Sequence, residues 1–176
     1  ETRQVVENHP APNVPLNAIR YGNDLVVAEL VTHSVVRLTA SGREVLTDKL
    51  YVPTGLAASQ GDLWAADWAT GTVWKIMAGG SPVMVPVAQG LAGLEGLAVD
   101  QDGSLLVVEA KAGRLSRIDV VTGAVSVLAE GLELGSPGPP SMPPTWVFNG
   151  VAVGPSGAIY VTGDKSNVLY RLRFPD

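Results

Sequence analysis

The stretch Asn17–Leu38 reads NAIRYGNDLVVAELVTHSVVRL, and the stretch Gly55–Ile76 reads GLAASQGDLWAADWATGTVWKI. When the two are aligned without a gap, both have an Asp-Leu pair before an apolar run, an acidic residue at the end of that run, and an alternating segment after a turn. Gly96–Ile118 and Gly150–Leu172 repeat the pattern. Self-similarity at a spacing of about 40 residues indicates a repeat architecture.

Each copy predicts three short strands. A segment rich in small residues comes first, a strongly apolar segment follows, and an alternating segment such as Arg114–Ile118 comes after a hairpin turn. Gly71, Gly113 and Asn167 in three of these turns suit a positive φ. His33 occupies the same position in the first copy and is the unusual member. An outer fourth strand is predicted in three copies, at Arg43–Thr47, Pro82–Val87 and Ala124–Leu128.

The outer strand that the last copy lacks is predicted at the start of the chain. Thr2–Glu7 has the length and alternation of such a strand. A ring of sheets that its own N-terminal strand completes is a β-propeller, and closure matters because an open ring exposes sheet edges. An open sandwich or a solenoid also uses short strands, but neither explains a strand missing at one end and present at the other. The sequence therefore predicts an all-β chain, one propeller domain of four four-stranded blades over residues 1–176, with repeats at about 15–50, 53–91, 94–132 and 147–174.

Composition excludes several functions. Hydrophobic residues make up 46% of the chain and charged residues 16%, which disfavours disorder. A net charge of −5 offers no basic surface for nucleic acid. No apolar run approaches the ~18–20 residues that cross a bilayer, so we expect no membrane partner. The chain has no cysteine, which excludes disulfides and thiolate sites.

The chain begins at Glu1 rather than at methionine. A cleaved secretory signal would give this start, and so would trimming of a longer chain. The first explanation, a cleaved secretory signal, favours a periplasmic or secreted location.

Two sets of polar residues are predicted to meet at one opening of the ring. In a propeller, the loops entering the innermost strands and the hairpins after the second strands lie on the same face. The positions before the innermost strands are Leu16, Thr54, Glu95 and Asn149, and the acids near the ends of the second strands are Glu29, Asp67, Glu109 and Asp164. Clustered oxygen ligands suit Ca²⁺ or Mg²⁺, and a mixed set also tolerates Zn²⁺.

The segment Glu95–Glu109, EGLAVDQDGSLLVVE, resembles the senescence marker protein/gluconolactonase (regucalcin-like) family of metal-dependent lactone hydrolases. NHL-repeat proteins and virginiamycin B lyases share the same blade pattern. The resemblance implies a propeller that hydrolyses a sugar lactone or similar small ester with a divalent metal, Ca²⁺ first and Zn²⁺ or Mg²⁺ next. Family metal ligands directly precede the glycine of an innermost strand, and Glu95 and Asn149 match that pattern. Thr54 and Leu16 do not supply the third ligand, and family rings have more blades than four.

In the mechanism that the resemblance implies, the metal polarises the substrate carbonyl and Asp67 or Glu109 activates water as the general base. The other interpretation is that the strand-end acids pair with Arg or Lys, that Glu95 caps a turn, and that Asn149 bonds backbone. The chain would then be a non-catalytic ligand-binding propeller or a structural one, with a truncated or engineered ring as one form of it.

Further residues are expected around the mouth. Glu29 and Asp164 are predicted to face the substrate, together with Trp146, which follows the proline-rich insertion Leu132–Pro144. Trp64 is predicted to pack between blades.

Ring size does not follow from the number of blades. Pro10, Pro12 and Pro15 stiffen the connection after the N-terminal strand, so that strand could complete the last blade of a neighbouring chain. We expect a homodimer in which two chains exchange terminal strands and form one larger ring. A four-bladed monomer is the alternative.

Overall fold

The computed structural model describes residues 13–138, 140 and 148–173. Among these residues the regular structure is β-strand, apart from the short 3-10 helix η1 (Ala110–Ala112). No helix in the described ranges is long and apolar enough to span a membrane. The strands form four antiparallel sheets, which are the four blades of a β-propeller, so the predicted fold class is confirmed.

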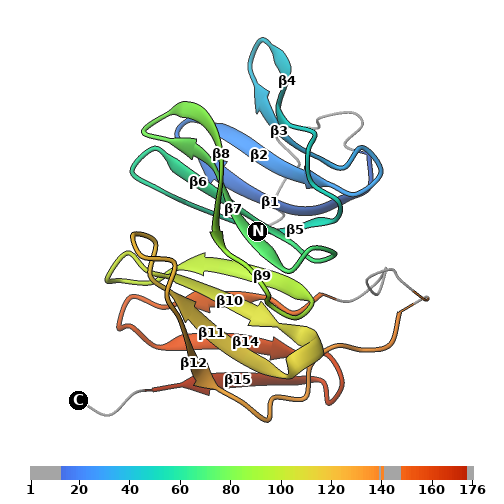
Figure 1. Ribbon diagram of the computed structural model, residues 1–176, viewed down its shortest axis with the longest axis vertical. Helices are drawn as coiled ribbons and strands as arrows, with labels where there is room; N and C mark the ends of the chain where they lie inside the picture. The colour runs from blue at the N-terminus through green and yellow to red at the C-terminus, as the bar shows by residue number, and fades with distance from the viewer. Residues whose placement is uncertain (1–12, 139, 141–147, 174–176) are drawn as a thin grey trace, which may run out of the picture.

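Each blade consists of strands that follow one another along the chain. Figure 1 shows the blue to green strands of blades 1 and 2 in the upper half and the yellow-green to red strands of blades 3 and 4 in the lower half. Blade 1 contains β1 (Pro15–Tyr21), β2 (Asp24–Glu29), β3 (Ser34–Thr39) and β4 (Gly42–Thr47); blade 2 contains β5 (Pro53–Ser59), β6 (Asp62–Asp67), β7 (Thr72–Ala78) and β8 (Ser81–Ala88). Blade 3 contains β9 (Leu94–Val99), β10 (Leu105–Glu109), β11 (Arg114–Ile118) and β12 (Val125–Ala129); blade 4 contains β13 (Val151–Val153), β14 (Ile159–Gly163) and β15 (Val168–Leu172).

The hairpin between the second and third strands uses a left-handed residue in every blade. His33, Gly71, Gly113 and Asn167 have φ of 54°, 63°, 60° and 55°. The predicted positive φ is therefore confirmed at all four positions, including the unusual histidine. His33 also forms a hydrogen bond between its ring Nδ1 and the carbonyl oxygen of Tyr51, a contact that glycine could not make.

The innermost strands lie side by side in the order β1, β5, β9, β13. In blades 2 and 3 they approach the following blade so closely that the residue after the mouth position must be small. A Cβ on Gly96 would lie 2.8 Å from the carbonyl oxygen of Asn149, and one on Gly55 would overlap the carbonyl oxygen of Glu95. These glycines are thus required by close packing of neighbouring blades rather than by their φ angles.

Three buried apolar clusters lie at the three junctions between consecutive blades. Each cluster joins residues from the facing sheets of two blades, as a propeller requires. Trp64 belongs to the cluster between blades 2 and 3, which confirms its predicted packing role. The clusters include Val35 and Leu63 between blades 1 and 2, Val73 and Leu105 between blades 2 and 3, and Leu115 and Ile159 between blades 3 and 4.

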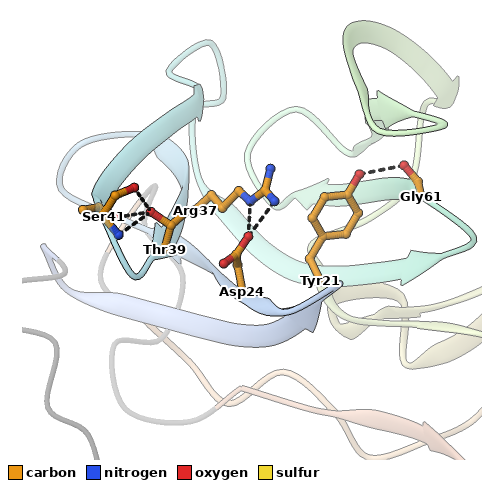
Figure 2. Close-up of polar contacts among 7 residues, drawn as sticks. Tyr21, Asp24, Arg37, Thr39, Ser41 and Gly61 are labelled. Atoms are coloured by element: carbon orange, nitrogen blue, oxygen red, sulfur yellow. Dashed lines mark hydrogen bonds and ion pairs between the residues drawn. The ribbon is translucent and has the colours of Figure 1, made fainter.

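Polar contacts reinforce the strands within and between blades. Figure 2 shows Arg37 of β3 paired with Asp24 of β2, with its Nη2 2.5 Å from the carboxylate. The Tyr21 hydroxyl donates to the carbonyl oxygen of Gly61 at 2.7 Å, which links blade 1 to the first turn of blade 2. The Arg37 pair is only partly buried, so it contributes at most about 1 kcal/mol.

Two predicted features lie outside the described residues. One is the closing strand at residues 2–7, so blade 4 has three described strands. The other is Trp146 in the segment after the proline-rich insertion.

Substitution of Gly71 by alanine is expected to destabilise the fold more than the same change at Gly22. Both residues are left-handed, with φ of 63° and 61°, so alanine costs about 1–2 kcal/mol at either position. At Gly71 the new methyl also overlaps the carbonyl oxygen of Leu91, whereas nothing lies within 4 Å at Gly22. We expect this collision to add roughly 1–3 kcal/mol. Equal shifts of the denaturation midpoint in the two variants would contradict the expected crowding at Gly71.

Candidate functional site

A cavity of about 160 Å³ opens where the innermost strands of the four blades begin. It takes residues from every blade, so the order of the blades itself builds it. This is the mouth that the sequence predicted from the positions before the innermost strands. Its lining consists of Leu16, Asn17, Thr54, Glu95, Gly96, Phe148, Asn149 and Gly150.

Glu95 is the single ionisable residue among the described residues of that lining, and it is only 2% exposed. Its Oε2 accepts hydrogen bonds from the backbone N–H and from the side-chain Nδ2 of Asn149, both at 2.7 Å. Its Oε1 is buried and has no hydrogen-bond partner among the described residues. One oxygen of the carboxylate is therefore anchored by Asn149, and the other is buried with its hydrogen-bonding capacity unused by the described residues.

Burial raises the pKa of Glu95 to about 7, because the charged form loses its hydration. The two hydrogen bonds from Asn149 act in the opposite direction, and the negative charge of Asp164 adds to the rise. Near neutral pH the carboxyl is consequently divided between its neutral and charged forms. A carboxyl with such a pKa in a concave site is a candidate for proton transfer.

Asn149 connects Glu95 to a second acidic side chain. Its Oδ1 accepts from the backbone N–H of Asp164 at 3.0 Å, while Asp164 Oδ2 accepts from the backbone N–H of Ser136 at 2.6 Å. Burial acts to raise the pKa of Asp164, but hydrogen bonds to its carboxylate, led by those from Ser136, outweigh it and hold the pKa below its usual value. Within the described ranges, Asp164 Oδ1 is buried without a hydrogen-bond partner, as Glu95 Oε1 is.

The acids at the ends of the second strands hold loops in place. Asp67 accepts from the backbone N–H groups of Tyr51 and Val52 at 3.0 and 2.9 Å, and Glu109 accepts from that of Ala92 at 2.9 Å. In both cases the donor belongs to the loop that enters the same blade. The innermost strand of each of these blades is thereby fixed at its start.

Glu109 and Glu29 also pair with cations. Glu109 receives two hydrogen bonds from Arg114, at 2.8 and 2.9 Å, and Glu29 receives one from Arg43 at 2.7 Å. Burial acts to raise the pKa of both acids, but hydrogen bonds and the arginine charges outweigh it, so both pKa values lie below the usual one. This is the pairing with Arg that the sequence left open as the alternative interpretation.

The structure therefore separates the two predicted sets of residues. Glu95 and Asn149 meet at the cavity, as expected. Asp67, Glu109 and Glu29 are buried, engaged in the contacts described above, and absent from the lining of the cavity. Their predicted part in catalysis or substrate contact stays a prediction.

The mouth offers few side chains that could bind a metal ion. Among the described residues no group of three or more histidine, aspartate or glutamate side chains could hold an ion. Asn149 presents its N–H to Glu95 and directs its oxygen to Asp164. The unpartnered oxygens of Glu95 and Asp164 are nevertheless of the kind that a hard cation prefers. The metal site stays a prediction.

Two lining residues were not identified from the sequence. Phe148 directly precedes the mouth position Asn149, and Asn17 follows the mouth position Leu16. The feature of the sequence that could have identified them is that each is next to a predicted mouth residue. An aromatic and an amide side chain at these positions could have been predicted to form part of the cavity wall.

No protein-family model matches the chain, and no curated protein sequence is similar to it. Solved structures do match. Virginiamycin B lyase from Staphylococcus aureus superposes with a TM-score of 0.69 at 14% identity, over 96% of this chain and 58% of the lyase. The WD40 β-propeller domain of Doa1 gives 0.71 at 11% identity, over 97% of this chain and 54% of that one. The computationally designed protein Ika4 gives 0.64 at 11% identity, over 99% and 100%.

These similarities establish the β-propeller fold and do not extend to function, because every identity is low. They do not confirm the gluconolactonase family that the sequence resembles. The chain spans a little over half the length of the lyase.

The stability of the protein is expected to fall as the pH rises from about 4.5 to about 7, by about 1–3 kcal/mol from Glu95 alone. The pKa of Glu95 is higher in the folded chain than its ordinary value of 4.5, so folding favours the neutral form. The Glu95→Gln variant keeps an oxygen that can accept from Asn149 and loses the charge. It should be more stable than the wild type above pH 7 and similar below pH 4.5. Urea denaturation at both pH values measures the free energies of unfolding of the two proteins. A difference between variant and wild type that is equal at both pH values would contradict the raised pKa of Glu95.

Proposed function

We propose that the cavity at the mouth binds a small oxygen-containing ligand and that Glu95 exchanges a proton with it. The observation that supports this is the state of one side chain. Glu95 is buried, anchored through Oε2, free at Oε1, and has a pKa of about 7. A general base is most effective when its pKa lies near the working pH.

The reaction class that we propose is hydrolysis of a small lactone or ester. Its support is the resemblance of Glu95–Glu109 to the gluconolactonase family, together with a cavity that suits a small substrate. Glu95 Oε1 takes a proton from water as the water oxygen bonds to the substrate carbonyl carbon. The tetrahedral intermediate then loses its alkoxy oxygen, and Glu95 returns the proton to that oxygen. The products are a carboxylic acid and an alcohol, joined in one molecule when the substrate is a lactone.

A divalent cation is the second candidate ligand, Ca²⁺ first and Zn²⁺ or Mg²⁺ next. Two buried carboxylate oxygens, on Glu95 and Asp164, favour it, because neither has a hydrogen-bond partner in the part of the chain that the structure describes. The residues that would hold the ion are Glu95, with Asn149 if its amide rotates to present oxygen, and Asp164. A bound cation would supply Lewis-acid polarisation of a carbonyl.

A lyase reaction, which the similarity to the structure of virginiamycin B lyase suggests, has less support. A histidine-to-alanine variant of virginiamycin B lyase is described as catalytically inactive. In the described part of this chain the histidine is His33, which is exposed, bonds Tyr51 and is absent from the cavity lining. His9 lies outside the described residues.

Hydrolysis of a panel of small lactones and aryl esters is the direct test. Since the base must be ionised, we expect kcat/KM to rise with pH through about 7, the pKa of Glu95 in the free protein. Glu95→Gln should reduce kcat by roughly 100-fold or more. Glu44→Gln is the matched control, because Glu44 is an exposed carboxylate on β4. Activity that Glu95→Gln leaves unchanged would reject the proposed role.

Thermal denaturation with CaCl₂, MgCl₂ or ZnCl₂ tests the cation separately. A site at the mouth should raise the unfolding free energy of the wild type by about 2.7 kcal/mol when the cation is at 100 times its Kd. The Glu95→Gln variant should lose most of that gain, and the Glu44→Gln control should keep it. Gains of equal size in all three proteins would place cation binding elsewhere.

A further inference from the structure

The hairpins between the second and third strands lie on the face of the molecule that carries the cavity, which we call the mouth face. Pro15 at the start of β1 pairs with Glu29 at the end of β2, so the start of an innermost strand is level with the hairpin of its blade. The residue two positions before the left-handed hairpin residue is exposed in every blade. It is Val31 in blade 1, Ala69 in blade 2, Lys111 in blade 3 and Lys165 in blade 4. Blades 1 and 2 therefore present apolar side chains at this position, and blades 3 and 4 present ammonium groups.

Three exposed apolar side chains gather on the blade 1 side of the mouth face. Val14, Val31 and Tyr51 are 50%, 61% and 66% exposed. The backbone N–H of Leu30 donates to the carbonyl oxygen of Val14 at 3.1 Å, and His33 in the same hairpin bonds the carbonyl oxygen of Tyr51. All three residues thus border one hairpin, and we call them the apolar strip. Exposed apolar side chains that are gathered in this way mark interaction sites, whereas scattered ones do not.

A cation lies beyond the apolar strip, on the blade 3 side. Lys111 Nζ is 3.7 Å from the centroid of the Trp68 ring, which belongs to blade 2. Gly93 leaves room for the stem of the lysine, because a Cβ there would lie 2.6 Å from Lys111 Cγ. Trp68 in turn adjoins the loop that carries Tyr51, since its backbone N–H donates to the carbonyl oxygen of Val52 at 2.9 Å. Tyr51, Trp68 and Lys111 consequently follow one another across the mouth face.

The charge of Lys111 is available to a ligand. Within the described ranges no carboxylate forms an ion pair with Lys111, whereas Arg114 in the same blade is engaged by Glu109. The face of an aromatic ring attracts an ammonium group without neutralising it. The Trp68 ring therefore holds the lysine in place and leaves its charge to attract an anion.

The apolar strip adjoins the cavity. Val14 comes two residues before Leu16, and Tyr51 comes three residues before Thr54. Leu16 and Thr54 both line the cavity. Its volume of about 160 Å³ is small beside the roughly 300–1,000 Å³ of pockets that enclose a drug-sized molecule. A larger ligand with one end at Glu95 would therefore extend over the mouth face.

We propose that the mouth face binds a small amphipathic anion, with its aromatic or aliphatic group on the apolar strip and its anionic group at Lys111. Burial of a hydrocarbon group on the strip is favourable because it removes apolar surface of both partners from water. An anion at Lys111 gains the attraction of an ammonium group that no described carboxylate uses. A neutral sugar would use neither feature.

The same geometry narrows the substrate class of the proposed hydrolysis. The substrate is a lactone or ester that carries an apolar group and an anionic group. This second statement rests on the proposed function, whereas the binding of an amphipathic anion does not.

Calorimetric titration with phenylbutyrate tests the binding, and phenylbutanol is the matched ligand without the charge. We expect the anion to bind about 2- to 5-fold more tightly than the alcohol, the range of an exposed ion pair. High salt should remove that difference. Lys111→Gln should weaken the anion to the affinity of the alcohol and leave the alcohol unchanged. Arg173→Gln is the control, because Arg173 is an exposed cation at the end of β15 that lies away from its hairpin.

Tyr51→Ser tests the apolar strip and should weaken both ligands. The contacts of Tyr51 with Asp67 and His33 use its backbone, so the substitution leaves them in place. If phenylbutyrate does not bind the wild type, the inference is overturned and the strip is left to a macromolecular partner. Equal affinity of the wild type and Lys111→Gln for phenylbutyrate would overturn it as well.

Hydrolysis of phenyl benzoate and of its para-carboxylate derivative separates the substrate class from the proposed function. The wild type should have the lower KM for the anionic ester, and Lys111→Gln should raise that KM without changing kcat. Hydrolysis of both esters with equal KM would overturn the substrate class alone. Binding of phenylbutyrate without hydrolysis of either ester would overturn the proposed function and the substrate class together, and would leave the binding of an amphipathic anion standing.

Discussion

The buried carboxylate at the end of the second strand is the constraint on which the blade depends. It turns a loop with unpaired backbone donors into a fixed entrance to the innermost strand. Asp67 does this for Tyr51 and Val52, and Glu109 for Ala92. Loss of such an acceptor would leave buried N–H groups unpaired, at about 1–3 kcal/mol each. The mouth residues Thr54 and Glu95 take their positions from strands whose entry loops are held in this way.

Two buried glutamates, Glu109 and Glu95, have different roles because they have different hydrogen-bond partners. Glu109 receives two hydrogen bonds from Arg114 and one from Ser116, so burial does not prevent its ionisation. Glu95 has only the neutral donors of Asn149, and burial raises its pKa to about 7. A paired buried carboxylate remains charged and structural. An incompletely paired one is where proton exchange or cation binding can occur.

The repeat made the blades predictable, because strand periodicity and the left-handed hairpin residue are local properties. Residue spacing also placed Glu95 and Asn149 together, since both directly precede an innermost strand. It could not assign the partners of Asp67 or Glu109, because the N–H groups they accept from lie 15 to 17 residues away in loops of no fixed pattern. Nor could it give the angle between blades. That angle follows from how side chains fill each junction, and four similar repeats suit rings of different size.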